Sequence, residues 1–144
     1  MIYLDSSAVF SVQGRDANTS TAVALLKSAG ETLALTQLCE VEFANALCLR
    51  MFRKEISRDE AAASIADLEQ NIRIGVYQLL PFPNSAFTRA KVLAQLLTPS
   101  IGVRSVDLLH VAAAMELGAT TLYTFDVKQH RTARAAGLKV NHLA

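Results

Sequence analysis

The sequence predicts a single α/β domain whose mainly parallel sheet of about five strands is covered by helices on both faces. Short runs of β-branched, aromatic and apolar residues alternate with longer segments that carry apolar residues at helical spacing. This alternation is typical of parallel strands joined by right-handed helical crossovers. The 144 residues, 51% of them hydrophobic, suffice for one sizeable core, so we expect one domain spanning residues 1–144.

The first predicted strand comprises residues 1–4 and is followed directly by Asp5, Ser6 and Ser7. Either serine can cap the apolar helix that begins here. Asp5 then stands at the carboxyl end of a strand, beside the positive end of a helix. It serves there either as a simple helix cap or as a functional carboxylate.

The next segment predicts a loop, a short helix and the second strand. Residues 13–18 are polar and predict the loop, after which Thr19 or Ser20 can cap a helix of about two turns. Residues 32–35 are β-branched or apolar and predict the strand.

A long helix that begins after Thr36 carries the second candidate acid. Glu42 is surrounded by apolar residues, which is a poor place for an unpaired charge. Glu40 is a rival, but residues two apart on a helix point about 200° away from each other, so only one of them can face a given site. We choose Glu42, which has Asn45 one turn further on, because the helix dipole already explains Glu40.

The middle and the end of the chain continue the alternation. The run SRDE at residues 57–60 predicts a capping box for the next helix. Residues 76–80 predict the third strand, and Asn84 or Ser85 can cap the helix that follows. A last short helix leads to an edge strand at residues 138–140.

Residues 104–126 hold two further candidate acids. They follow a turn-rich segment at residues 98–102, which we predict to be a loop. Asp107 opens a helix with apolar residues at i, i+3, i+4 and i+7. Residues 120–125 predict a strand, which Asp126 closes at the carboxyl end, where open α/β sheets bind their ligands.

Four acids are therefore predicted to meet at one edge of the sheet: Asp5, Glu42, Asp107 and Asp126. Carboxylates that face one crevice repel each other unless protons or cations lie between them. With no His, Cys or Lys evident as a partner, these acids suit a hard divalent ion bound through oxygen, Mg²⁺ or Mn²⁺ rather than Zn²⁺. The usual substrate of such an ion is a phosphate ester.

The order and surroundings of these acids resemble those of PIN-domain ribonucleases. The similarity spans almost the whole chain and rests on DSS from Asp5, EFANAL from Glu42, DLLHVAAA from Asp107 and TFD ending at Asp126. The length and the single domain are similar to the VapC toxins of type II toxin–antitoxin modules. The resemblance implies a flattened α/β/α sandwich, an Mg²⁺- or Mn²⁺-dependent endoribonuclease acting on tRNA or rRNA, a homodimer, and inhibition by a cognate antitoxin.

Carried over to this sequence, the resemblance implies that the four acids are catalytic and bind the metal, with two hydroxyls beside them, Ser6 and Thr124. Some relatives add another acid shortly after the last one. Residues 127–130 hold none, which speaks against a second tightly bound ion.

Several basic residues flank the acids in the sequence. Arg104, Lys128 and Arg131 can bind RNA phosphates, although each is equally explained as an ordinary solvated charge. His110 lies one turn after Asp107, and we interpret it as a packing or surface histidine rather than as a general base.

The composition limits the partners and the location. The formal net charge of +1 shows no overall bias toward nucleic acid or membranes. No run of 18 apolar residues exists and the N-terminus lacks the positive segment of a signal peptide, so we expect a cytoplasmic protein without membrane contact. Cys39 and Cys48 lie roughly 13 Å apart on one helix, too far for a disulfide, and are predicted to be core thiols.

Other functions stay open at this point. A phosphoacceptor receiver domain also places acids and Mg²⁺ at a sheet edge, but this chain lacks the double acid after its first strand and the late lysine. A non-catalytic PIN scaffold would not need all four acids. A housekeeping RNA-processing nuclease of the same fold cannot be separated from a toxin by sequence.

Overall fold

The protein contains a five-stranded sheet in which every strand is parallel to its neighbours. The structure is a computed structural model that describes residues 1–13 and 16–143. The strands follow the order β3-β2-β1-β4-β5. Their bounds are β1 Ile2–Leu4, β2 Leu33–Thr36, β3 Gln78–Leu80, β4 Thr121–Tyr123 and β5 Lys139–Val140. The predicted α/β fold with a parallel sheet of about five strands is confirmed.

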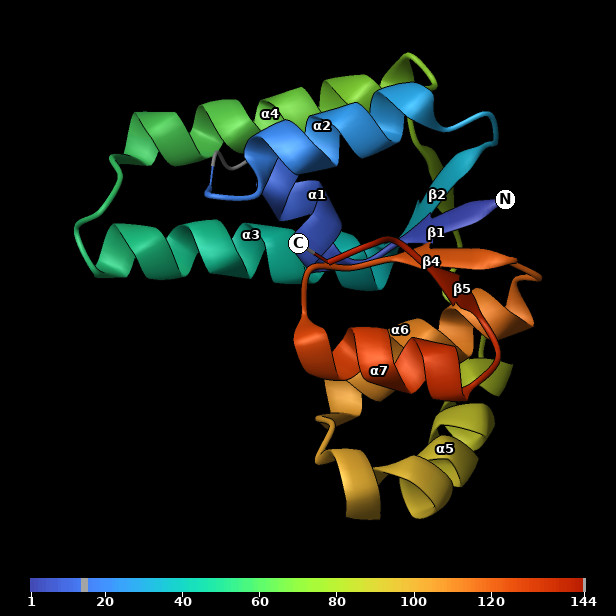
Figure 1. Ribbon diagram of the computed structural model, residues 1–144. Coiled ribbons are helices and arrows are strands. Elements are labelled where there is room, and N and C mark those ends of the chain that lie inside the picture. The colour runs from blue at the N-terminus through green and yellow to red at the C-terminus, as the bar shows by residue number, and fades with distance from the viewer. Residues whose placement is uncertain (14–15, 144) are drawn as a thin grey trace.

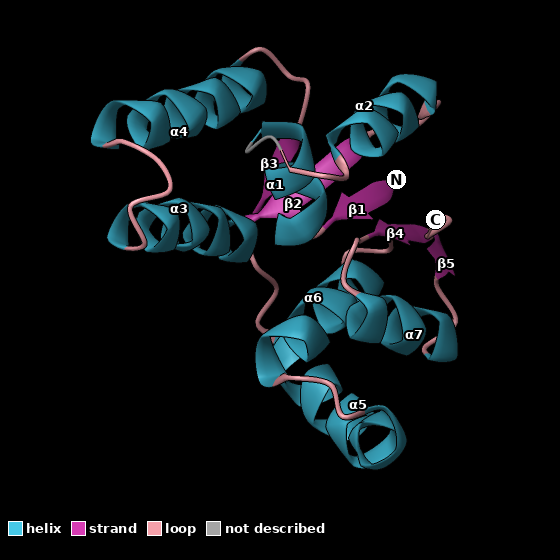
Figure 2. Ribbon diagram, turned by 60° about the vertical axis from the view of Figure 1, so that its left-hand side comes forward, coloured by secondary structure: helices cyan, strands magenta, loops and turns pink. Residues whose placement is uncertain are grey.

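Helices cover both faces of this sheet (Figures 1 and 2). One face carries α1 Ser6–Gln13, α2 Thr19–Ser28, α3 Gln37–Phe52 and α4 Arg58–Arg73. The other face carries α5 Ser85–Ile101, α6 Ser105–Glu116 and α7 Val127–Ala135. The result is the three-layer α/β/α arrangement.

The central strand β1 supplies both hydrophobic cores. Ile2 and Leu4 belong to the cluster with α1, α3 and α4, while Tyr3 belongs to the cluster with α5, α6 and α7. Side chains of a strand alternate between faces, so a strand covered on both sides must be apolar throughout. All three residues are at most 4% exposed, and Asp5 follows them at the carboxyl edge.

Helix α5 runs through the segment predicted as a loop at residues 98–102. The prediction was wrong because Pro99, which lacks an N–H, removes only one hydrogen bond near the end of a helix. The helix continues to Ile101 and ends at Gly102, whose φ of 69° is left-handed and whose N–H donates to the Thr98 carbonyl at 2.8 Å.

The strand ends differ from the prediction at two places. Strand β4 stops at Tyr123, because the Thr124 N–H donates to the Asn141 side chain at 2.8 Å instead of to a neighbouring strand. Asp126 is therefore not the end of a strand. It is the N-cap of α7, and its Oδ1 accepts from the Gln129 N–H at 2.8 Å. Strand β3 is also shorter than the predicted residues 76–80.

Three smaller predictions also need correction. The helix caps proposed at Thr19 or Ser20 are not seen, since Asn18 is the N-cap of α2 and makes no side-chain cap bond. Cys39 is buried as predicted, whereas Cys48 is exposed and is not a core thiol. Residues 14 and 15 of the predicted loop lie outside the described residues.

The capping box of α4 is confirmed and gives a stability prediction. The Ser57 hydroxyl accepts from the Glu60 N–H at 3.1 Å, and the Glu60 carboxylate accepts from the Ser57 N–H at 3.4 Å. Ser57→Ala removes the first bond and should lower the free energy of unfolding by about 1 kcal/mol, measured by urea denaturation. Ser28→Ala, at the exposed end of α2, is the control and should change it by less than about 0.5 kcal/mol. Equal losses in the two variants would contradict a role for the cap.

No helix in the described ranges is long and apolar enough to cross a membrane.

Candidate active site

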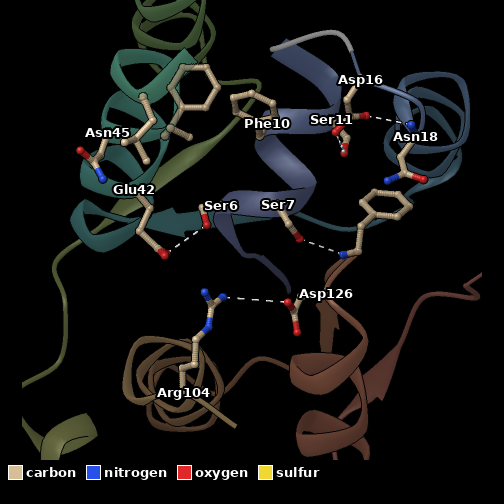
Figure 3. A pocket seen from close by; sticks show the side chains of 14 residues that line it. Ser6, Ser7, Phe10, Ser11, Asp16, Asn18, Glu42, Asn45, Arg104 and Asp126 are labelled. Atoms are coloured by element: carbon tan, nitrogen blue, oxygen red, sulfur yellow. Dashed lines mark hydrogen bonds and ion pairs between the residues drawn. The ribbon is translucent and has the colours of Figure 1, made fainter. Parts of the chain in front are cut away.

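A pocket of about 520 Å³ opens at the carboxyl edge of the sheet, between α1, the middle of α3, the N-cap of α6 and the segment that leads into α7 (Figure 3). Its polar lining includes Ser6, Glu42, Asn45, Arg104 and Asp126. The two other candidate acids, Asp5 and Asp107, are buried, and each contacts a residue that lines the pocket. The sheet topology thus brings together acids from four separate segments of the chain.

Asp5 is 1% exposed, and both of its carboxylate oxygens accept hydrogen bonds. Oδ1 accepts from the Ala8 N–H at 2.8 Å, and Oδ2 accepts from the Thr124 hydroxyl at 2.6 Å. The Ser7 hydroxyl lies 2.7 Å from Oδ1. Burial raises the pKa of the Asp5 carboxyl, while the charge of His110 and these donors oppose the shift. Asp5 is therefore both a cap of α1 and part of the site.

Two hydroxyl groups connect Asp5 to the segment that carries Asp126. Thr124 Oγ1 accepts from the Asp126 N–H at 3.0 Å, and Ser7 Oγ accepts from the Phe125 N–H at 2.8 Å. Thr124 stands beside the acids as the resemblance implied. Sequence reasoning treated Ser7 only as a possible cap and missed this role, although its place two residues after Asp5 was a usable signal.

Glu42 enters the pocket from α3, and two side chains hold it. Its Oε1 accepts from the Ser6 hydroxyl at 3.0 Å and is hydrogen-bonded to Nε2 of His110. Burial opposes ionisation, but the hydrogen bonds and the charge of His110 outweigh it and lower the pKa of Glu42. Glu40 lies outside the pocket, and burial together with the charge of Glu69 on α4 raises its pKa. Glu42, and not Glu40, lines the pocket.

His110 is part of this site, which the sequence did not reveal. Its side chain is fully buried, and its Nδ1 lies 2.9 Å from the Tyr3 hydroxyl, which lies 3.0 Å from Thr36 Oγ1. Burial raises the pKa of Tyr3 well above its usual value, so the phenol keeps its proton. His110 is packed in the interior, as one of the two interpretations predicted, and is not a surface histidine. The expectation that the acids lack a histidine partner was wrong, because His110 is hydrogen-bonded to Glu42. Spacing one turn from Asp107 placed His110 on the right helix face, but sequence does not show which group it meets.

Arg104 joins the two remaining acids. Its Nε donates to Asp107 Oδ2 at 2.9 Å, its Nη2 donates to Asp107 Oδ1 at 3.3 Å, and Nη2 lies 4.0 Å from Asp126 Oδ2. Figure 3 shows its side chain reaching toward Asp126. The hydrogen bonds and charge of Asp107, with a smaller effect of Asp126, raise the pKa of Arg104. Lys128 and Arg131 are exposed on α7 and do not line the pocket.

The donor atoms fit a hard divalent ion in their chemistry. Carboxylate and hydroxyl oxygens are the ligands that Mg²⁺ and Mn²⁺ prefer. Glu42, Asp126 and Ser6 line the pocket, and the buried Asp5 and Asp107 contact residues that line it. In residues 1–13 and 16–143, however, no three acidic, histidine or cysteine side chains are grouped closely enough to hold a metal. The guanidinium of Arg104 already binds both oxygens of Asp107. The metal ion stays a prediction.

Known proteins share this fold. The PIN domain family model matches residues 2–135. The structure of FitAB bound to an IR36 DNA fragment aligns with a TM-score of 0.73 at 22% identity, covering 100% of this chain and 98% of that chain. VapC20 of Mycobacterium tuberculosis, described as a sarcin-ricin loop cleaving toxin, aligns with a TM-score of 0.66 at 19% identity, covering 96% of each chain. VapBC2 of Rickettsia felis, bound to DNA from its promoter, aligns at 0.65 and 19% identity, covering 100% of both chains.

A comparison with curated proteins gives no match. The structural relatives, which include VapC toxins of VapBC modules, share less than 25% identity with this chain and establish its fold. The family model extends further, because it covers nearly the whole sequence and all four candidate acids. The protein is a member of the PIN domain family.

Proposed function

We propose that the protein is a metal-dependent endoribonuclease that hydrolyses RNA phosphodiester bonds. The observation that supports this most is that four acids from separate segments of a PIN domain adjoin one pocket: Glu42 and Asp126 line it, and Asp5 and Asp107 contact residues that line it. A metal-assisted nuclease needs such oxygen donors beside an open pocket that admits a polyanion.

The four acids would hold Mg²⁺ or Mn²⁺. When bound, such an ion lowers the pKa of water and stabilises negative charge on phosphate oxygens. The chain's own side chains prepare the donors. Ser7 and Thr124 fix both oxygens of Asp5, and Ser6 and His110 fix Oε1 of Glu42, so that these carboxylates need little reorganisation.

We also propose that this nuclease is the toxin of a VapBC-type pair and that it acts on tRNA or rRNA. Its support is the PIN membership together with structural relatives that include a toxin described as cleaving the sarcin-ricin loop. A cognate antitoxin as partner is supported by the VapBC relatives. We further propose a homodimer, since Val41, Leu49 and Phe52 leave apolar surface exposed on α3. The proposed location is the cytoplasm.

Cleavage of a total tRNA and rRNA pool by the purified protein tests this function. We expect discrete fragments with Mg²⁺ or Mn²⁺ and none with EDTA. If the protein binds metal but cleaves none of these RNAs, the proposed substrate class is contradicted. Absence of both metal binding and cleavage would contradict the nuclease and favour the non-catalytic scaffold. A small antitoxin-like reading frame beside the coding sequence would distinguish a toxin from a housekeeping nuclease.

Substitution of the two glutamates tests the choice of Glu42. Glu42→Gln removes a charged donor from the pocket and should lower the cleavage rate by about 10- to 100-fold. Glu40→Gln makes the same chemical change two residues away on the same helix and should alter the rate less than about twofold. Rates are compared at saturating metal. A severe effect of Glu40→Gln with a mild effect of Glu42→Gln would show that the other helix face carries the function.

A further inference from the structure

Arg104 occupies the position among the acids where a cation is needed. Asp107 is buried, and both of its oxygens accept hydrogen bonds from the fork of this single guanidinium. The same Nη2 atom lies within 4.0 Å of Asp126. Two carboxylates this close to one point repel each other unless positive charge stands between them. The guanidinium supplies that charge in the structure.

The side chain of Arg104 is nevertheless free to leave. It is 75% exposed, whereas the side chain of Asp107 is 5% exposed. Arg104 is the N-cap residue of α6 but makes no side-chain cap bond, so moving its side chain away breaks no cap hydrogen bond of this helix. An exposed charge pair of this kind is weak enough to exchange its partner. A buried, charged Asp107 without a neighbouring cation, in contrast, is energetically costly.

An incoming divalent ion would need the atoms that Arg104 now binds. Both oxygens of Asp107 are engaged, and Nη2 of the same guanidinium lies 4.0 Å from Asp126 Oδ2. Within the described part of the chain, this arrangement coincides with the lack of any group of three acids ready for a metal. A divalent ion bound here would therefore compete with the guanidinium for the same oxygens.

We propose that Arg104 is a built-in counter-cation, which neutralises Asp107 and Asp126 in the metal-free protein and is displaced when a divalent ion binds. This inference rests on the proposed function, because it requires the acids to bind metal. It assigns to Arg104 a positioning role: the residue holds Asp107 and Asp126 in place in the metal-free protein and sets the affinity of these acids for the metal. Displacement leaves the guanidinium in the pocket while the ion takes over the oxygens.

Calorimetric titration with Mn²⁺ alone tests the competition. Arg104→Gln removes the competing cation and should tighten Mn²⁺ binding about tenfold. The ion then no longer has to displace the exposed guanidinium from the two oxygens of Asp107. Lys91→Gln, on the exposed surface of α5, removes the same charge away from the pocket and should leave the affinity unchanged. Circular dichroism checks that both variants are folded.

A direct readout follows the guanidinium itself. The Nε–H resonance of Arg104, identified by its loss in Arg104→Gln, should move from its hydrogen-bonded position as Mg²⁺ is added, with the same midpoint as the heat of a calorimetric titration with Mg²⁺. An unmoved resonance, or equal Mn²⁺ affinity in wild type and Arg104→Gln, would overturn the displacement and leave the nuclease proposal standing. Absence of metal binding in both proteins would overturn the inference and the metal-dependent function together.

Discussion

Asp126→Asn is expected to reduce RNA cleavage at least about a hundredfold while the protein stays folded. The substitution removes a proposed metal ligand, but an asparagine keeps an oxygen that accepts from the Gln129 N–H and still caps α7. The other carboxylate oxygen makes only a 4.0 Å approach to Arg104, so its loss has little effect on stability. Cleavage rates and thermal unfolding, measured on the same preparation, check both parts.

Asp5→Asn is a less clean test of the same idea. Both oxygens of Asp5 accept hydrogen bonds, so the amide of an asparagine would face the hydroxyl or backbone donors that now bind the carboxylate. We expect Asp5→Asn to lose both activity and stability. Full activity of either variant would refute the assignment of these acids.

Phe43→Ala should lower the free energy of unfolding by about 3–5 kcal/mol. Phe43 is 1% exposed, and its ring packs edge to face on Phe10, with ring centroids 6.0 Å apart and planes at 62°. Truncation leaves a cavity between α1 and α3 that the surrounding helices cannot fully close. Urea denaturation, analysed with a fixed slope, gives the change.

Phe52→Ala is the matched control for this prediction. Phe52 lies on the same helix but is 83% exposed, so its removal should change the stability of the monomer by less than about 0.5 kcal/mol. Similar losses in the two variants would mean that α3 is not held by the core contact of Phe43. Phe52→Ala also tests the proposed homodimer, because a loss of self-association would place that exposed surface in the interface.

Most of the fold was predictable, because it depends on periodicity that is local in the sequence. Alternating short apolar runs and helical stripes predicted the strands, and the capping box at residues 57–60 predicted the start of α4. The boundaries failed where competing local interactions decide them. Thr124 could have continued β4, but the side chain of Asn141 takes its N–H, and Pro99 is tolerated in the last turn of α5.

The candidate acids were also predictable, since the ends of parallel strands meet at one edge whatever the loops between them. Their partners were not. His110 bonds to the carboxylate of Glu42, 68 positions away in the sequence. The contacts of Arg104 with Asp107 and Asp126 depend on the rotamer of the arginine and on how close the three residues lie in the fold. Such pairings depend on side-chain directions that only the packed structure defines. Whether the acids bind metal stays a prediction.

The strand order has a consequence for how the protein is made. Strand β1 pairs along one of its two edges with β4. The β4 residues Thr121, Leu122 and Tyr123 are synthesised more than a hundred residues after the β1 residues that they pair with. The hydrogen bond from the Thr124 hydroxyl to Asp5 likewise cannot form until Thr124 has been synthesised. A nascent chain therefore carries the first acids without the structure that positions them. Under the proposed function, the order of synthesis would delay a working site until Thr121–Thr124 have been made.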